Sequence, residues 1–346
     1  MSIAKINSIG GGPRTTGLVA LTFVAAALGS SVTTFPSGMP EVHSADTCVG
    51  WELSQGQWTQ DTTKCVGNLG EAPDAGCGSV DDGELNGDEQ QAFWSFDSSL
   101  KKQCGLRRES TSLNSFTGKH VVVVGDSVAR SVYASVLRIA AVDENAYQLT
   151  SQEKHRDWKH KLKDNGVSDF IWAPFMDNVT QTMDSLFMNN NSEKPPDVLI
   201  LGAALWDALH VRDVEKYEQQ VSKLSAKINS MHSSGNTKYS NGSKRINTDM
   251  FWLTVTMVDS TKLTDTQKIK HMTNEKLRRY DNVGKRFLVG KNKLVHPVDA
   301  REISSGCARV SGLNDSCSAD GIHYRAVVYD ATVQVIGNTV RVLGEV

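Results

Sequence analysis

From Lys119 onward, short apolar runs alternate with segments of helical periodicity, and this alternation limits the fold more than any other feature of the chain. The apolar runs are continuous, as in strands that a parallel sheet buries on both faces. They occupy residues 120–124, 197–201, 250–258 and 293–298. Helical patterns lie at 129–141, 214–231, 265–287 and 324–343. This order predicts a three-layer α/β/α domain with a mainly parallel sheet, whose ligand site lies at the carboxyl ends of the strands.

The chain before this region has a different amino-acid composition. Residues 41–113 are rich in Gly, Asp, Ser and Gln and contain Cys48, Cys65, Cys77 and Cys104. They predict a disulfide-braced N-terminal cap rather than part of the sheet. We therefore expect a leader and stalk over 1–40, a cap over 41–113 and a catalytic domain over 114–346.

The leader is basic and then apolar. Lys5 and Arg14 are the only charges before Glu41, and residues 18–28 form an apolar run. This order predicts entry into the secretory pathway. Eleven apolar residues suit a cleaved signal peptide, the uncharged span 15–40 suits a type II signal-anchor, and an apolar tail on a cytosolic protein is the third reading. We expect a single-pass type II protein of the Golgi or ER lumen, with secretion as the alternative.

The six cysteines and the charge balance restrict the class of protein further. An even cysteine count behind a secretory leader predicts three disulfides, and Cys307 with Cys317 would close a short local loop. No metal site is expected, because no two cysteines have C-x2-C spacing. A net charge of -2 gives no field to attract nucleic acid or an anionic membrane. Sequons compatible with a glycoprotein occur at Asn178, Asn190, Asn241 and Asn314.

Gly125-Asp126-Ser127 follows the first apolar run and leads into a helical pattern. Ser127 is therefore expected at a strand-to-helix turn, where unpaired backbone N–H groups favour an anion and the N–H of Ser127 can serve as one oxyanion donor. Asp126 is expected to be structural. Asp and Ser also cap helices well, so the tripeptide alone fits a plain helix cap too.

A second motif at the far end of the chain distinguishes these readings. Asp320-Gly321-Ile322-His323 stands directly before the last helical pattern. A serine needs a base to become a nucleophile, and the base needs an acid that fixes its tautomer. We therefore predict a catalytic triad in which Ser127 is the nucleophile, His323 the base and Asp320 the acid.

These residues give the chain a family resemblance. Residues 124–130, with the GDSxxR pattern from Gly125 to Arg130, and the DxxH block from Asp320 to His323 resemble the PC-esterase superfamily of the GDSL/SGNH-like class. That group includes trichome-birefringence-like polysaccharide O-acetyltransferases and the luminal domains of capsule and sialate O-acetyltransferases. The resemblance implies an SGNH-hydrolase-like fold and an acyl-serine intermediate, with acetyl delivered to a glycan hydroxyl or to water.

The resemblance also defines the remaining expectations about the site. The SGNH pattern has an asparagine oxyanion donor in a GxND block, whereas this chain reads GAALWD from Gly202 to Asp207, so Gly202 and, more weakly, Ala203 are the candidate donors. No bound cofactor is expected; the acetyl donor, acetyl-CoA or an acetylated intermediate, is a substrate. The chain lacks the many transmembrane segments of some relatives, so a membrane-imported donor would need a separate transporter.

Several residues near these motifs are candidates for substrate binding. Arg130 lies one helical turn after Ser127 and could hold an acidic group, or pair with Asp126 or Asp320. Trp206 and Asp207 follow the second predicted strand and are expected at the same sheet edge, where Trp206 could stack on a sugar. His155 and His160 belong to a basic loop that could attract an acidic sugar or simply face solvent.

Three functions fit these observations: a glycan or polysaccharide O-acetyltransferase, a hydrolytic carbohydrate or lipid esterase, and an inactive glycan-binding protein of the same fold. Transfer and hydrolysis share the nucleophile and differ only in which acceptor reaches the acyl-enzyme. The resemblance and the apparent anchor favour transfer. The complete set of Ser127, Asp320 and His323 disfavours the binding protein.

Overall fold

A computed structural model describes most of the chain after residue 114. The described residues are Ser54, 57–60, 92–95, 115–143, 145–149, 154–187, 194–233, 247–290, 294–309, 317–318 and 320–345. The leader, the four cysteines of residues 41–113 and the domain boundaries at 40 and 113 lie outside them and stay predictions. No helix in these ranges is both long and apolar enough to cross a bilayer.

A six-stranded sheet forms the centre of the fold. Its strands, in spatial order, are β4 (Trp158–Lys161), β5 (Val167–Trp172), β3 (His120–Gly125), β6 (Val198–Gly202), β7 (Asp249–Leu253) and β8 (Val295–Val298). All neighbouring strands are parallel except the edge pair β4 and β5. Every residue of β6 is buried, because helices cover both faces of the sheet.

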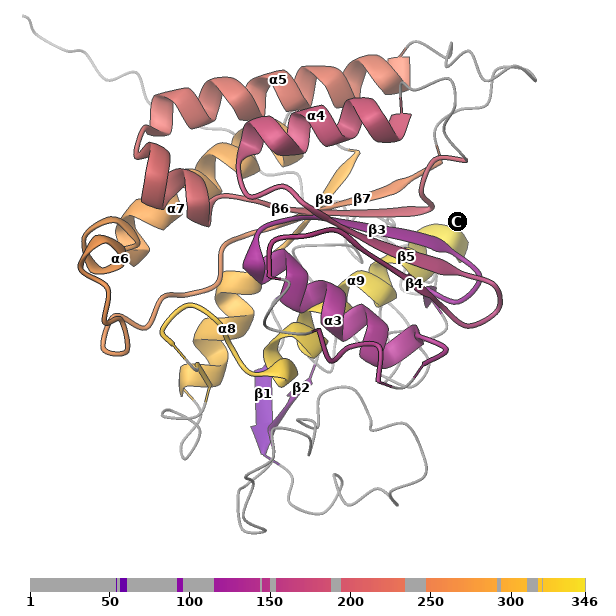
Figure 1. The fold of residues 1–346 in the computed structure, drawn as a ribbon, viewed down its shortest axis with the longest axis horizontal. Helices are drawn as coiled ribbons and strands as arrows, with labels where there is room; N and C mark the ends of the chain where they lie inside the picture. Colours follow the sequence, from indigo (N-terminus) through magenta and orange to yellow (C-terminus); the bar gives the residue numbers. More distant parts are fainter. Residues whose placement is uncertain are drawn as a thin grey trace, which may run out of the picture. The chain divides into compact units, whose positions relative to one another are not determined.

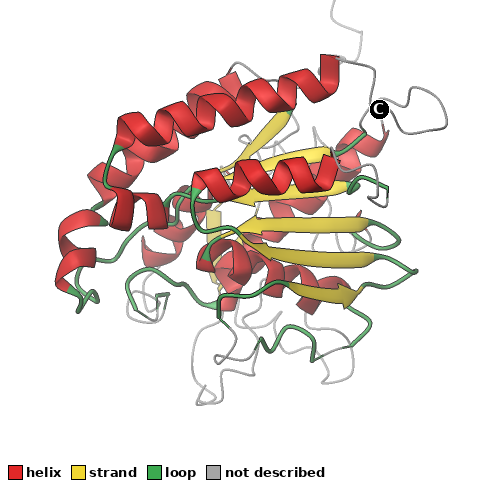
Figure 2. Ribbon diagram, turned by 45° about the horizontal axis from the view of Figure 1, so that its top comes forward, coloured by secondary structure: helices red, strands yellow, loops and turns green. Residues whose placement is uncertain are grey.

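The helices form two layers (Figures 1 and 2). One face carries α3 (Ser127–Ala140), α8 (Ala300–Arg309) and α9 (Ala326–Glu345). The other carries α4 (Met176–Phe187), α5 (Val214–Ser233) and α7 (Asn274–Gly284). The short helix α6 (Thr266–His271) and the π-helical segments η6 (Asp207–Val211) and η7 (Lys285–Gly290) complete the chain. This confirms the three-layer α/β/α fold with a mainly parallel sheet.

The structure contains elements that hydrophobic patterning did not predict. β4 is an edge strand of alternating exposure, and residues 158–161 read WKHK, so the predicted basic loop around His160 is wrong there. β5 contains Ser168 and Asp169, which interrupt its apolar run, and α4 and α8 are rich in polar residues. The single helix expected over 265–287 breaks after α6, because the side chain of Thr273 caps a new helix by accepting from Lys276 N at 3.3 Å.

The segment 41–113 contributes a small sheet of its own. Strands β1 (Gln57–Gln60) and β2 (Ala92–Ser95) pair antiparallel, next to α8 and α9 respectively. Ser54 is fully buried, and its Oγ accepts a hydrogen bond from Asp299 N at 3.0 Å. The cap therefore touches the main domain at the end of β8, the sheet edge that also carries the candidate site.

Candidate active site

Ser127 is presented by a tight turn between β3 and α3. The turn depends on Gly125, because a Cβ at this position would lie 2.0 Å from the carbonyl oxygen of Gly202 in the neighbouring strand β6. The same carbonyl oxygen accepts a hydrogen bond from Asp126 N at 3.2 Å. Backbone contact with a central strand thus determines where the chain leaves β3 and where the serine begins α3.

Asp126 anchors the other side of this turn. Its carboxylate is 2% exposed and accepts a hydrogen bond from Val128 N at 3.0 Å, which caps α3. Burial away from water raises the pKa of Asp126 to about 6, against hydrogen bonds from backbone N–H groups that lower it. Asp126 is thus structural, as expected.

The three residues of the predicted triad are in hydrogen-bond contact. His323 Nε2 lies 2.8 Å from Ser127 Oγ, across 196 positions of sequence. His323 Nδ1 lies 2.8 Å from Asp320 Oδ2. When Nδ1 carries its proton, Nε2 is free to accept one from the serine. The arrangement can therefore deprotonate Ser127 during attack on an electrophile and stabilise the imidazolium that results.

The side chain of Asp320 also stabilises the loop that carries the acid and the base, because it accepts hydrogen bonds from the loop backbone. Oδ1 of Asp320 accepts hydrogen bonds from Ile322 N at 2.9 Å and His323 N at 2.7 Å. Partial burial alone would raise the pKa of Asp320. The hydrogen bonds from the His323 ring, His323 N and Ile322 N, with the positive charge of the imidazolium, outweigh burial and hold this pKa well below its usual range. The acid is therefore ionised throughout the neutral range.

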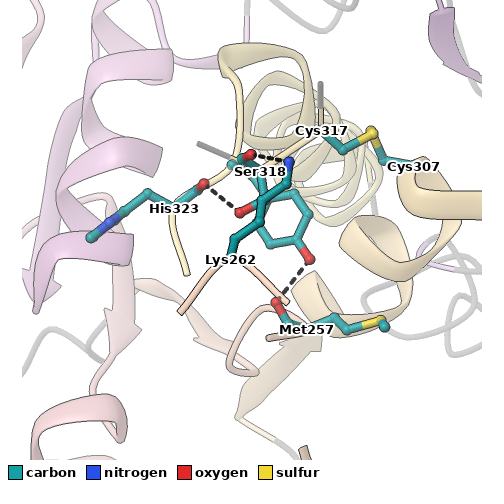
Figure 3. Close-up of a disulfide and its surroundings, with 7 residues drawn as sticks. Met257, Lys262, Cys307, Cys317, Ser318 and His323 are labelled. Carbon is teal, nitrogen blue, oxygen red and sulfur yellow. Dashed lines mark hydrogen bonds between the residues drawn. A yellow bond between two sulfur atoms is a disulfide. The ribbon is translucent and has the colours of Figure 1, made fainter. Parts of the chain in front are cut away.

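Ser318 within the loop and Lys262 outside it hold the loop in place (Figure 3). Ser318, 4% exposed, donates from Oγ to the carbonyl oxygen of His323 at 3.1 Å and accepts from Gly321 N at 2.9 Å. Lys262 Nζ donates to the carbonyl oxygen of Ser318 at 2.7 Å. The disulfide between Cys307 and Cys317, predicted from their spacing, is confirmed. It ties the start of the loop to α8.

A cleft of about 390 Å³ opens beside the triad. Its lining includes Ser127, Asp320 and His323, and the side chains of Arg130 and Trp206, both predicted to bind substrate. The guanidinium of Arg130 donates to the carbonyl oxygen of Lys154 and forms no ion pair with Asp126 or Asp320. Arg130 therefore has no salt bridge within the site, and its contact with a substrate stays a prediction.

Asp207 does not contact the cleft, which corrects its predicted role in substrate binding. Its side chain is fully buried, and Oδ2 accepts from Met176 N, the first residue of α4, at 2.9 Å. Burial raises the pKa of Asp207 to about 6. Trp206 lines the cleft, whereas the side chain of Asp207, the first residue of η6, is buried against the first residue of α4.

Gly202 and Ala203 lie at the carboxyl end of β6, next to the turn that carries Ser127. Together with Asp126 they line a small separate cavity behind the turn, not the cleft at Ser127. The carbonyl oxygen of Ala203 accepts from the buried Tyr217 hydroxyl at 2.9 Å. The segment after β6 reaches the cleft only at Leu205 and Trp206. The oxyanion roles of Gly202, Ala203 and the N–H of Ser127 stay predictions.

Sequence reasoning missed much of the cleft wall. The His155 ring stacks on Trp172 with centroids 4.5 Å apart, and Trp172 meets Trp206 edge to face at 5.6 Å. His210, at the end of η6, tilts onto Trp206 at 4.9 Å, and α6 contributes Lys268. These residues come from segments distant in sequence, and only the basic run around His155 gave a signal. No cluster of potential metal ligands occurs among the described residues.

Comparison with known proteins gives the chain a relative. No family model matches. The chain is 27% identical over 240 residues to Protein ALTERED XYLOGLUCAN 9 of Arabidopsis thaliana, an alignment that covers 64% of this chain and only 60% of that protein. The resemblance to the trichome-birefringence-like, PC-esterase group is thereby confirmed.

Solved structures of similar fold were also found. A protein described as a platelet activating factor from Streptococcus pneumonia is 15% identical, with a TM-score of 0.41, covering 69% of this chain and 92% of that one. A catalytic mutant of the acetylxylan esterase Axe2 from Geobacillus stearothermophilus is 9% identical, with a TM-score of 0.39, covering 65% and 94%.

Proposed function

We propose that this chain is a serine acyltransferase that moves acetyl groups on glycan hydroxyls through an acyl-serine intermediate. The observation that carries the proposal is the pair of 2.8 Å contacts that link Ser127 to His323 and His323 to Asp320. A nucleophile, a base and an acid in this relation, open to a cleft, are what acyl transfer requires. A protein that only bound glycans would not need a nucleophile, a base and an acid in hydrogen-bond contact.

The reaction has two half-steps. In the first, Ser127 Oγ attacks the carbonyl carbon of the acetyl donor while His323 Nε2 takes the serine proton. The donor's leaving group departs with that proton, and acetyl stays on Ser127. In the second, a glycan hydroxyl gives its proton to His323 Nε2 and attacks the acetyl carbon, and Ser127 Oγ leaves and is reprotonated. Asp320 stabilises the imidazolium in both steps.

The negative charge on the acetyl oxygen needs hydrogen-bond donors. The N–H of Ser127 lies in the first turn of α3, where the helix dipole also favours an anion. It is the donor that we assign. Asp126 accepts a hydrogen bond from the neighbouring N–H of Val128, which is therefore not free to bind the acetyl oxygen.

A hydrolytic carbohydrate or lipid esterase is the second candidate, and one observation favours it. The side chain of His323 is 33% exposed and that of Asp320 is 47% exposed, so water reaches the acid–base pair in the unliganded protein. An acyl-enzyme left open to water hydrolyses. Transfer therefore requires that the bound acceptor covers His323.

The glycan acceptor is proposed from the relatives. The Arabidopsis protein is named for xyloglucan and the Geobacillus enzyme is an acetylxylan esterase, which supports a polysaccharide as the substrate class here. The acetyl donor, proposed to be acetyl-CoA or an acetylated intermediate, is a substrate rather than a bound cofactor. We further propose a secretory location, in the Golgi lumen or outside the cell, since the Cys307–Cys317 disulfide suits an oxidising compartment.

An active-site serine probe tests the enzyme. The full chain is treated with a fluorophosphonate, and we expect labelling at Ser127 that is lost in Ser127→Ala and reduced more than about 1000-fold in rate in His323→Ala. Ser185→Ala, an exposed serine of α4, is the matched control and should label normally. No labelling of the folded wild-type chain would refute both enzyme functions. Acetyl release to water without transfer to any glycan would leave only the esterase.

A further inference from the structure

The cleft beside Ser127 is lined by an excess of positive charge. Three basic side chains line it: Arg130 from α3, Lys154 from the segment before β4, and Lys268 from α6. Among the described residues of the lining, Asp320 is the only carboxylate, and it is hydrogen-bonded to His323. A concave surface with one sign of charge concentrates ligands of the opposite sign.

None of these cations forms a salt bridge within the part of the protein that the structure describes. Neither lysine forms an ion pair with a described carboxylate, and Arg130 donates only to a carbonyl oxygen. Arg130 is also half-buried beside the nucleophile. Burial lowers the pKa of Arg130, and the nearby charge of Asp126 only partly offsets this. A partly desolvated cation without a direct salt bridge gains more from an incoming anion than a fully hydrated cation does.

Aromatic rings share the same wall. Trp172 and Trp206 are partly exposed and line the cleft, with the rings of His155 and His210 packed against them. Tryptophan offers a rigid apolar surface at low entropic cost, which suits the apolar face of a sugar ring. The ligand that fits both features is a sugar chain that carries negative charge.

We propose that the cleft selects an acidic glycan, a chain whose uronic acid carboxylates contact Arg130, Lys154 and Lys268 while its rings lie against Trp172 and Trp206. This inference rests on the proposed function and names the substrate class of the same site. The three cations come from separate segments of the chain, so a polymer with one carboxylate per sugar can contact more than one of them.

A phosphorylated acyl donor is the competing source of negative charge, and the turn at Ser127 argues against it. Phosphate groups are commonly held by several free N–H groups at a helix N-terminus. Here the carboxylate of Asp126 occupies the N–H of Val128 at the start of α3. A doubly charged phosphate at this helix end would be repelled by the carboxylate of Asp126. A carboxylate held by lysines at the rim of the cleft would lie farther from Asp126 and would be repelled less.

Binding to the full-length Ser127→Ala protein tests the proposal without turnover. The ligands are an oligogalacturonide and the same oligomer with its carboxyls methyl-esterified, so that only the charge differs. We expect the acid to bind at least about 10-fold more tightly at low salt, and the difference to shrink at 0.5 M NaCl because exposed charges are screened. Equal affinity for the acid and the ester would overturn the proposal.

Charge variants locate the contact. Lys154→Gln and Lys268→Gln should each weaken binding of the acidic oligomer about 3- to 10-fold relative to binding of its methyl ester. This is the size expected for a single contact to a charged ligand. Lys223→Gln, an exposed lysine of α5 outside the lining, should leave the ratio unchanged. Variants that weaken coenzyme A binding but not oligogalacturonide binding would assign the charge to the donor and refute the acidic glycan.

The serine probe separates this inference from the function on which it rests. Labelling at Ser127 with no preference for the acidic oligomer would refute the acidic glycan and retain the acyltransferase. Absence of labelling with a preserved preference would refute the acyltransferase and retain an acidic-glycan site.

Discussion

The two halves of the site are held in place in different ways. The turn at Gly125–Ser127 grows out of the central strand β3 and is fixed by its backbone contact with Gly202 in β6. The loop that carries Asp320 and His323 lies outside the sheet and depends on Ser318, Lys262 and the Cys307–Cys317 disulfide. The nucleophile is thus positioned by a central strand of the sheet. The acid and base are positioned by contacts between loops, which include these side chains, the disulfide and a backbone hydrogen bond from Asp259 N to the carbonyl oxygen of Gly321 at 2.9 Å.

The difference predicts that substitutions in the two halves of the site affect stability and activity differently. A change at the turn should disturb the fold itself, because neighbouring strands cannot separate without loss of the core. A change in the loop should loosen the acid and base and leave the sheet intact. The following predictions test this contrast, from the largest expected effect to the smallest.

Gly125→Ala should destabilise the whole domain. The new Cβ would lie 2.0 Å from the carbonyl oxygen of Gly202 and 2.7 Å from the Cβ of Ala129. Because both neighbours belong to the core, we expect a loss of about 3 kcal/mol or more in the free energy of unfolding, measured by denaturant titration. The control is Gly344→Ala, where a Cβ meets nothing within 4 Å and a helical alanine should stabilise. Equal stability of the two variants would contradict the close approach.

Removal of the disulfide should affect the loop more than the sheet. Cys307 and Cys317 are 10 positions apart, and a crosslink over such a loop contributes about 3 kcal/mol. In the variant with both cysteines changed to serine, amide hydrogen exchange should accelerate over 317–325 and stay slow over 120–125. Labelling of Ser127 should also slow, at a temperature where the variant is folded. Uniform acceleration in both segments would show that the halves are not held independently.

The two carboxylates of the site should respond to pH in opposite directions. The pKa of Asp126 is raised from 3.8 to about 6 by burial, so the folded state holds this proton more tightly than the unfolded state. Its contribution to stability therefore falls as pH rises from about 4 to about 6. Asp320 has a depressed pKa, so its contribution is present at neutral pH and is lost on acidification below about 4.

Asp126→Asn isolates the first of these effects. The stability difference between wild type and variant should change by about 2 to 3 kcal/mol between pH 4 and pH 6.5, with the wild type relatively more stable at the acidic end. Urea titrations at several pH values measure this. Asp207→Asn, at the second buried carboxylate with a pKa of about 6, should show the same sign. A flat difference for Asp126→Asn would show that its carboxyl titrates normally.

Ser318→Ala should have the smallest effect on stability and a distinct effect on rate. The change removes a donor to the carbonyl oxygen of His323 and leaves the buried N–H of Gly321 without its acceptor, which costs about 1 to 2 kcal/mol. Because Ser318 acts by positioning His323, its replacement by alanine should lower the kcat of acetyl transfer about 10-fold with little change in KM. Ser318→Thr, which retains the hydroxyl, should recover most of the rate. A loss confined to KM would contradict a positioning role.

Sequence reasoning predicted the elements whose signal is local. β3, β6 and β7 were found because buried parallel strands are continuously apolar, and α3 because its start coincides with a capping residue. It missed β5, where Ser168 and Asp169 interrupt the apolar run and Asp169 pairs with His120 at 2.8 Å in the neighbouring strand. It also placed Asp207 in the cleft, because a residue's position after a strand does not reveal which side of the turn its side chain faces.

By itself, the sequence determined the chemistry available to this protein: a serine at a strand-to-helix turn, an Asp and a His close enough to pair within one loop, and two cysteines able to brace that loop. Tertiary structure alone decided that His323 Nε2 comes within 2.8 Å of Ser127 Oγ, and that His155, Trp172 and Lys268 form the walls of one cleft. The reason is physical. Capping and pairing within a few residues depend on local backbone geometry, whereas contacts across 196 positions depend on how the helices pack on the sheet.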